Sequence, residues 1–229
     1  MKLGKASAAA GIVALLAVPA VQTPADAAGA TSCRGRAATI VGTDGPDRLI
    51  GTRKIDVIVG LGGNDVIRGK GRKDVLCGDG GNDRVKGGKG NDKIQGSAAN
   101  DRLRGGPGTD IVRGGRGNDN VKGGKDGDAV SGGEGDDLVG GSKGSDRVAG
   151  GAGVDTVTAG GGNDRLFGSG GNDRLVGGKG ADRLNGGAGD DTLNGVDTAP
   201  NDFLAGNDGT DTCLADPGDT TATCEVSTP

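Results

Sequence analysis

An aspartate recurs every nine residues through most of this 229-residue chain, and this period limits the fold more than any other feature. A leucine, isoleucine or valine stands two residues after each aspartate, and a glycine stands five residues before all but one. The seventeen aspartates in phase are Asp47, Asp56, Asp65, Asp74, Asp83, Asp92, Asp101, Asp110, Asp119, Asp128, Asp137, Asp146, Asp155, Asp164, Asp173, Asp182 and Asp191. In a disordered Gly- and Asp-rich linker, nothing would keep an aliphatic residue two positions after every aspartate. The period therefore predicts a repeating fold.

The repeated unit is Gly-Gly-x-Gly-x-Asp-x-U-x, where U is a large aliphatic residue, and residues 87–95 follow it in full. Its glycines allow positive φ and tight turns. Asparagine is the commonest residue before the aspartate and tolerates the same conformations. We expect x-U-x to form a three-residue strand, with U pointing inward and its neighbours outward. Two units then complete one coil of 18 residues, and aspartates 18 apart stack about 4.8 Å from each other.

Stacked carboxylates repel one another unless a cation lies between them. Calcium suits such a site, because it takes oxygen ligands in irregular geometry and the turns present main-chain carbonyl oxygens as well. The chain has no histidine and only four cysteines, which argues against zinc. All seventeen aspartates are therefore candidate ligands of several calcium ions.

The aspartates divide into two ladders. The first ladder contains Asp47, Asp65, Asp83, Asp101, Asp119, Asp137, Asp155, Asp173 and Asp191, and the second contains Asp56, Asp74, Asp92, Asp110, Asp128, Asp146, Asp164 and Asp182. Four units lack the glycine two residues before the aspartate, with Lys54, Arg72, Ala99 and Asp126 in its place, and only Ala99 precedes the first ladder. We expect calcium to occupy the first ladder more fully.

The run from 47 to 195 resembles the calcium-binding RTX, or haemolysin-type, nonapeptide repeat, and the chain is similar to secreted actinobacterial calcium-binding proteins of this type. The resemblance implies an all-β, right-handed parallel β-roll, with two short-stranded parallel sheets and calcium held between successive turns. RTX toxins and proteases typically use a C-terminal export signal and carry a catalytic or lytic domain. This chain departs from both patterns.

The first 27 residues have the pattern of a signal peptide: Lys2 and Lys5, an apolar stretch from 6 to 21, and the small-x-small site that ends at Ala27. A membrane anchor fits less well, because this stretch is shorter than the about 20 residues that a spanning helix needs. We therefore expect a secreted, extracellular monomer without a membrane span.

The remaining chain divides into three parts. Residues 28–46 form a degenerate N-terminal cap, in which Ile40 keeps the aliphatic position while Ala38 replaces the aspartate. Residues 47–195 form the calcium-binding β-roll, and 196–229 a C-terminal cap and tail.

Four cysteines in an exported chain suggest two disulfides, with free buried thiols as the alternative. The sequence alone permits three pairings. In a rod that rises about 4.8 Å per coil, neither Cys33 nor Cys77 can reach Cys213. This leaves Cys33–Cys77 at the N-terminal cap and Cys213–Cys224 at the C-terminal cap.

Three kinds of function compete. We expect a calcium-binding structural or interaction module and no enzyme, since the chain has no histidine and no further domain large enough for a cleft. Ice binding would need a regular outward row of Thr or Asx, and the outward positions are mixed. The outward residues Arg84, Lys86, Arg102 and Arg104 form a basic stripe that could bind anionic cell-wall or extracellular polysaccharide, or simply keep the roll soluble. We expect no specific nucleic-acid binding, because no aromatic residues interleave the stripe.

Overall fold

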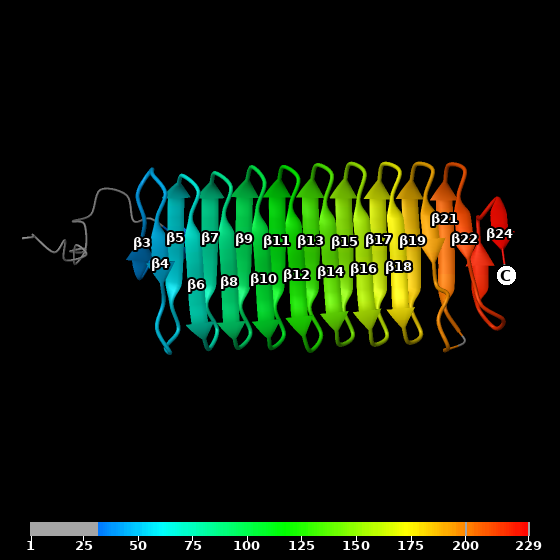
Figure 1. The fold of residues 1–229 in the computed structure, drawn as a ribbon, viewed down its shortest axis with the longest axis horizontal. Coiled ribbons are helices and arrows are strands. Elements are labelled where there is room, and N and C mark those ends of the chain that lie inside the picture. The colour runs from blue at the N-terminus through cyan, green and yellow to red at the C-terminus, as the bar shows by residue number, and fades with distance from the viewer. Residues whose placement is uncertain (1–31, 200, 229) are drawn as a thin grey trace, which may run out of the picture.

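The structure is a computed structural model that describes residues 32–199 and 201–228; the predicted signal peptide lies outside them. These residues form an elongated β-roll, in which the chain winds back and forth between two parallel sheets of eleven strands each (Figure 1). Within the described residues, no helix is long and apolar enough to cross a membrane. The expected all-β parallel roll is confirmed.

The odd-numbered strands form one sheet and the even-numbered strands the other, after a short antiparallel hairpin of β1 (Ser32–Cys33) and β2 (Arg36–Ala37). The odd sheet consists of β3 (Ile40–Val41), β5 (Val57–Gly62), β7 (Val75–Gly80), β9 (Lys93–Ala98), β11 (Ile111–Arg116), β13 (Ala129–Glu134), β15 (Arg147–Ala152), β17 (Arg165–Gly170), β19 (Arg183–Ala188), β21 (Phe203–Asp208) and β23 (Thr220–Ala222). The even sheet consists of β4 (Arg48–Ile50), β6 (Val66–Gly71), β8 (Arg84–Lys89), β10 (Arg102–Pro107), β12 (Asn120–Lys125), β14 (Leu138–Lys143), β16 (Thr156–Gly161), β18 (Arg174–Lys179), β20 (Thr192–Asn194), β22 (Thr212–Leu214) and β24 (Val226–Thr228).

The register of both sheets follows the 18-residue coil. In the even sheet, Val85 of β8 pairs with Leu103 of β10, which pairs with Val121 of β12. In each case the partner lies 18 residues further on. The sheets therefore stack identical positions of the repeat on top of one another.

The aliphatic residue of each unit points into the roll, as the alternation predicted. In β8, for example, Val85 is buried between the exposed Arg84 and Lys86. The inward aliphatic residues of both sheets form one continuous core that also contains Cys213, and the partly buried Ile40 packs against it. One such residue in every nine supplies the apolar burial of the roll.

The expected strand length was wrong. The strands of the regular run, β5 to β19, span six residues each and not three, because the glycines after x-U-x keep pairing with identical backbone in the next coil, as Gly106 does with Gly124. The asparagines before the aspartates of the regular run do not take positive φ, whereas Asn201 before Asp202 does, with 87°. The turn between β8 and β9 bends at Gly88 and Gly90, with φ of 123° and 116°.

Both predicted disulfides are present and lie near the ends of the rod. The Cα atoms are 5.8 Å apart in Cys33–Cys77 and 6.0 Å apart in Cys213–Cys224. At the N-terminal end, Cys33 and Cys77 pack against three valines of β5 and β7 that face outward. These valines, Val57, Val59 and Val75, are buried here. The first hairpin therefore covers the outer face of the first odd strands.

Candidate metal centre

The aspartates of each ladder are linked by hydrogen bonds from coil to coil. The main-chain N–H of each aspartate donates to Oδ1 of the aspartate one coil later. Asp83 N lies 2.8 Å from Asp101 Oδ1, and Asp101 N lies 2.7 Å from Asp119 Oδ1. The second ladder repeats the pattern, with 2.7 Å from Asp92 N to Asp110 Oδ1. These bonds fix every carboxylate in the same orientation inside the turn.

The second carboxylate oxygen is the notable feature of both ladders. In seventeen aspartates Oδ2 is buried and accepts no hydrogen bond: Asp65, Asp74, Asp83, Asp92, Asp101, Asp110, Asp119, Asp128, Asp137, Asp146, Asp155, Asp164, Asp173, Asp182, Asp191, Asp202 and Asp211. A buried carboxylate oxygen without a partner is costly, so this many in one fold call for an explanation. A positive ion is the partner that suits such an oxygen.

Glycine makes room for this oxygen. A glycine stands five residues before every aspartate of the regular run except Asp164, which has Ala159 there, and at Gly96 a side chain would collide with Asp101 Oδ2. The carbonyl oxygen of Gly114, from the next coil, lies 2.7 Å from the same ideal Cβ position. A carboxylate oxygen of one coil and a main-chain oxygen of the next thus converge, which is the donor set that a hard dication such as Ca²⁺ prefers.

The electrostatics point the same way. Removal from water raises the pKa of Asp101 to about 8 and that of Asp92 and Asp137 to about 7. The N–H of the preceding ladder aspartate opposes the shift, whereas neighbouring ladder carboxylates add to it. Without a cation, burial therefore disfavours the charged form that a metal would bind.

The first member of each ladder differs from the others. Oδ2 of Asp47 accepts hydrogen bonds from the main-chain N–H and the hydroxyl of Thr43, at 2.6 and 2.9 Å. Oδ2 of Asp56 accepts the same pair from Thr52, at 2.6 and 3.0 Å. A threonine four residues before the aspartate thus satisfies the oxygen that is left open elsewhere.

The ladders also continue beyond the predicted set. Asp182 N donates to Asp202 Oδ1, and Asp191 N donates to Asp211 Oδ1, across a spacing of 20 residues. Asp202 and Asp211 have the same buried, unpartnered Oδ2 and were missed as candidate ligands because a two-residue insertion shifts their phase. A leucine two residues after Asp202 was the available signal.

A second row of oxygens runs beside the first ladder. Asn64, Asn82, Asn100 and Asn118 each precede an aspartate of this ladder, and the side-chain Oδ1 of each accepts the N–H of the residue 18 further on. Together with Asp65, Asp83, Asp101 and Asp119 these asparagines line an open groove of about 520 Å³. The asparagine side chains therefore brace the turn.

No three His, Cys, Asp or Glu side chains come together as a metal site within 32–199 and 201–228. An ion held in either ladder would therefore take most of its oxygens from main-chain carbonyl groups. Oδ2 lacks a hydrogen-bond partner in both ladders, so the expectation of fuller occupancy in the first ladder stays a prediction.

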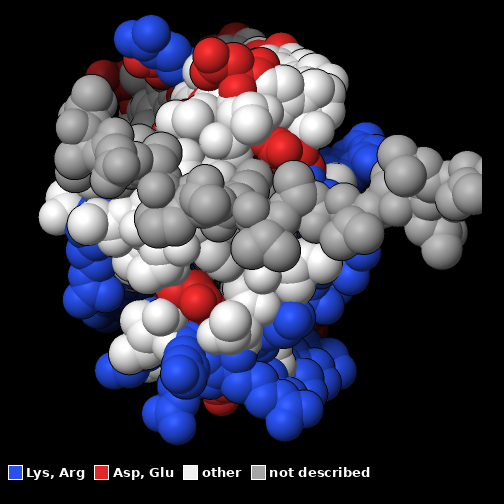
Figure 2. Space-filling model, turned by 90° about the vertical axis from the view of Figure 1, so that its left-hand side faces the viewer, with Lys and Arg blue, Asp and Glu red and all other residues white. Residues whose placement is uncertain are grey.

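The predicted basic stripe lies on the outer face of the even sheet. Arg84, Lys86, Arg102 and Arg104 are all exposed, and Arg84 and Lys86 pair in register with Arg102 and Arg104. Seen along the rod, further basic side chains gather at its lower edge (Figure 2). There the even strands turn into the odd ones, and the cations at these turns are Arg53, Lys54, Lys70, Arg72, Lys73, Lys89, Lys125, Lys143 and Lys179.

Comparison with known proteins agrees with this geometry. The family model described as the RTX calcium-binding nonapeptide repeat (4 copies) matches residues 41–76, 78–112, 104–139, 140–175, 167–197 and 196–222. No curated protein matches the chain.

The role of Oδ2 can be tested by comparing two isosteric variants. Asp101→Asn keeps an oxygen for the N–H of Asp83 but replaces the open carboxylate oxygen by an amide, so we expect fewer bound calcium ions. Asp56→Asn is the matched control, because a single amide oxygen can still accept both hydrogen bonds of Thr52. Equilibrium dialysis with metal analysis should show a loss of one or two ions for Asp101→Asn and none for Asp56→Asn. Equal losses would contradict the special role of Thr52.

The raised pKa values predict how the metal-free roll responds to pH. A carboxyl whose pKa is higher in the folded than in the unfolded chain stabilises the fold below the unfolded value, and this stability is lost as the pH rises through the folded value. The pKa rises from 3.8 to about 6 at Asp83, to about 7 at Asp92 and to about 8 at Asp101. In calcium-free buffer we therefore expect the strand signal in circular dichroism to grow as the pH falls from 8 to 5. A decrease over this range would contradict the prediction.

Proposed function

Because the chain belongs to the RTX calcium-binding nonapeptide repeat family, we propose that it is a secreted protein that folds on binding several calcium ions and has a structural or interaction role outside the cell. The observation that carries the proposal is the series of buried Oδ2 atoms without a partner. A chain that buries so many carboxylates needs a compensating charge at each of them.

The residues divide the work within each turn. The N–H of one ladder aspartate orients the next carboxylate, as at Asp83 and Asp101. Oδ2 of that carboxylate and the carbonyl oxygens of the turn would then hold Ca²⁺, which supplies the positive charge. The inward glycine keeps side-chain atoms out of this space. Ion binding and folding are thereby coupled, since the oxygens converge only when successive coils are stacked.

Two features support an extracellular role. All four cysteines are paired in disulfides, which persist in oxidising surroundings. The N-terminal residues 1–27 have the composition of a signal peptide. Extracellular calcium would then complete folding after export.

We also propose that the protein is not an enzyme. The adjacent carboxylates Asp136 and Asp137 are the type of pair that glycosidases use. Asp137 is only 4% exposed, however, and Asp136 Oδ1 accepts the main-chain N–H of Val154. Both residues of this pair are thus held within the turn.

Calcium-dependent folding is the direct test of the proposal. We expect the purified mature chain to lack strand signal in circular dichroism at pH 7.5 in excess chelator, because glycine-rich backbone is costly to order and one aliphatic side chain per nine residues buries little apolar surface. Millimolar calcium should restore the signal. Magnesium at the same concentration is the control and should restore less, since it demands near-ideal octahedral geometry. A strand-rich spectrum in chelator that calcium leaves unchanged would overturn the proposal.

A second candidate function is binding of anionic cell-wall or extracellular polysaccharide by the basic stripe. Arg68, Lys86, Arg104 and Lys122 stand directly beside one another on β6, β8, β10 and β12. Like charges in directly opposed positions destabilise a sheet. An anionic polymer lying along this column would relieve that repulsion.

Replacing Arg84, Lys86, Arg102 and Arg104 with serine tests this candidate. If the stripe binds the polymer, the calcium-loaded variant should elute from an anionic polysaccharide matrix at a clearly lower salt concentration than the unaltered protein. The control replaces Lys89, Lys125, Lys143 and Lys179 at the lower edge with serine, which changes the net charge equally. If the elution salt concentration falls equally for both variants, only the net charge matters for binding. If it does not change for the stripe variant, the basic stripe only keeps the roll soluble.

A further inference from the structure

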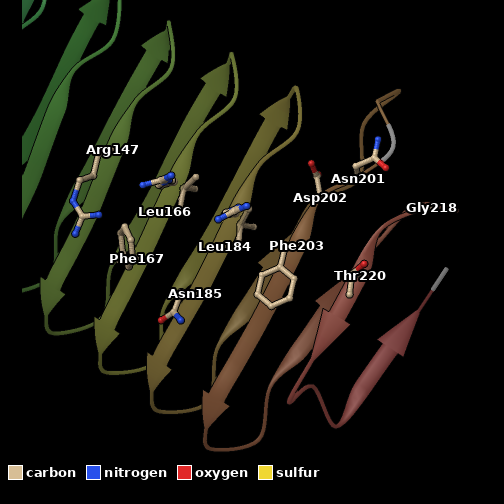
Figure 3. Close-up of a pocket in the computed structure, with 12 residues that line it drawn as sticks. Arg147, Leu166, Phe167, Leu184, Asn185, Asn201, Asp202, Phe203, Gly218 and Thr220 are labelled. Carbon is tan, nitrogen blue, oxygen red and sulfur yellow. The ribbon is translucent and has the colours of Figure 1, made fainter.

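A groove of about 650 Å³ lies on the outer face of the odd sheet near the C-terminal end of the rod (Figure 3). It crosses strands β15, β17, β19 and β21. Its lining combines arginines, aromatic rings and an amide: Arg147, Arg165, Arg183, Phe167, Phe203 and Asn185. The repeat does not require these outward residues, so their combination needs its own explanation.

Three arginines form a column in this groove. Arg147 pairs in register with Arg165, and Arg165 pairs with Arg183, so their strands lie about 4.8 Å apart. Within the described ranges 32–199 and 201–228, the one ion pair between side chains joins Arg116 and Glu134, away from this groove. Asp202 also lines the groove, but it is 1% exposed and belongs to the inner ladder. The column is therefore free to bind an anion.

The two aromatic residues of the whole chain, Phe167 and Phe203, both line this groove. The guanidinium carbon of Arg147 lies 4.2 Å from the centre of the Phe167 ring, which holds both side chains in place. Phe203 continues the arginine column, since it pairs with Arg183, and it is 41% exposed. Asn185 stands beside Phe167 on the next strand and adds an amide between the rings.

We propose that this groove binds an acidic saccharide, with uronate carboxylates on the arginine column and sugar rings against Phe167 and Phe203. Guanidinium groups bind carboxylates with paired hydrogen bonds, and a phenyl ring offers an apolar face to the C–H side of a sugar. Single-stranded nucleic acid fits less well, because it stacks successive bases on successive aromatic rings, and here Asn185 and Arg183 separate the two rings. The site is distinct from the basic stripe, which contains no aromatic residue.

The two phenylalanines allow a direct test. In the calcium-loaded full chain labelled with 4-fluorophenylalanine, the ¹⁹F spectrum contains two signals, which Phe167→Leu and Phe203→Leu assign. We expect both signals to shift and saturate on titration with trigalacturonic acid, and to stay in place with the neutral trisaccharide maltotriose. The double variant Arg165→Ser/Arg183→Ser should weaken the binding at least tenfold.

The matched control is Arg84→Ser/Arg102→Ser, which removes the same charge from the equivalent in-register positions of the even sheet. It should leave the affinity within twofold. Equal weakening by both double variants, absence of a shift, or a stronger response to oligothymidylate would each overturn the proposal.

The inference rests on the calcium-folded roll of the proposed function, so circular dichroism of the same samples with and without calcium separates the two. A roll that folds without calcium and still binds the uronate would refute calcium-dependent folding and keep the groove.

Discussion

The hydrogen bond from the N–H of each ladder aspartate to Oδ1 of the aspartate one coil later is the constraint on which the rest of the roll depends. Because donor and acceptor belong to the same position of successive coils, every coil must bring its aspartate back to the same place. The insertion near the C-terminal end shows how strict this is. The spacing grows to 20 residues at Asp182 and Asp202, yet the bond is kept at 2.7 Å. In the longer connection between β20 and β21, Asp197 accepts the N–H of Gly180 from the preceding coil.

Most of this architecture could be predicted from the sequence, because the same nine-residue repeat determines the turns, the buried positions and the stacking of the coils. The 18-residue register and the inward aliphatic residues follow from the period, as Val85, Leu103 and Val121 illustrate. The rise per coil then excludes the cysteine pairings that would span the rod. Strand length did not follow, because pairing of the glycines after x-U-x depends on the neighbouring coil and not on local propensity. Ala99 shows the same limit: it takes a φ of 73°, held by the coils on either side, although alanine avoids this region.

The hydrogen bonds that end each ladder could not be predicted from the repeat, because residues outside the repeat pattern make them. Thr43 and Thr52 close the first aspartates with an N–H and a hydroxyl, which only their placement four residues earlier makes possible. At the other end, Asp202 N donates to Asp219 Oδ1 and Asp211 N donates to Glu225 Oε2. The last donors thus find carboxylates from the tail. Each ladder therefore ends on a hydrogen bond and not on an open donor.

The interior and the outer surface of the roll differ in the kind of ligand that they can distinguish. Inside, each coil repeats the same aspartate, glycine and aliphatic residue, so the interior can distinguish ions but not macromolecular partners. Outside, the residues differ from coil to coil, and two groups are set apart: the cations of β6 to β12 on one sheet, and the arginines and rings of β15 to β21 on the other. The ladders hold neighbouring strands about 4.8 Å apart, so both surfaces present their groups in rows of fixed spacing. Such rows suit an extended polymer whose charges also recur at regular intervals, and they would gain this order only once the carboxylates inside are neutralised.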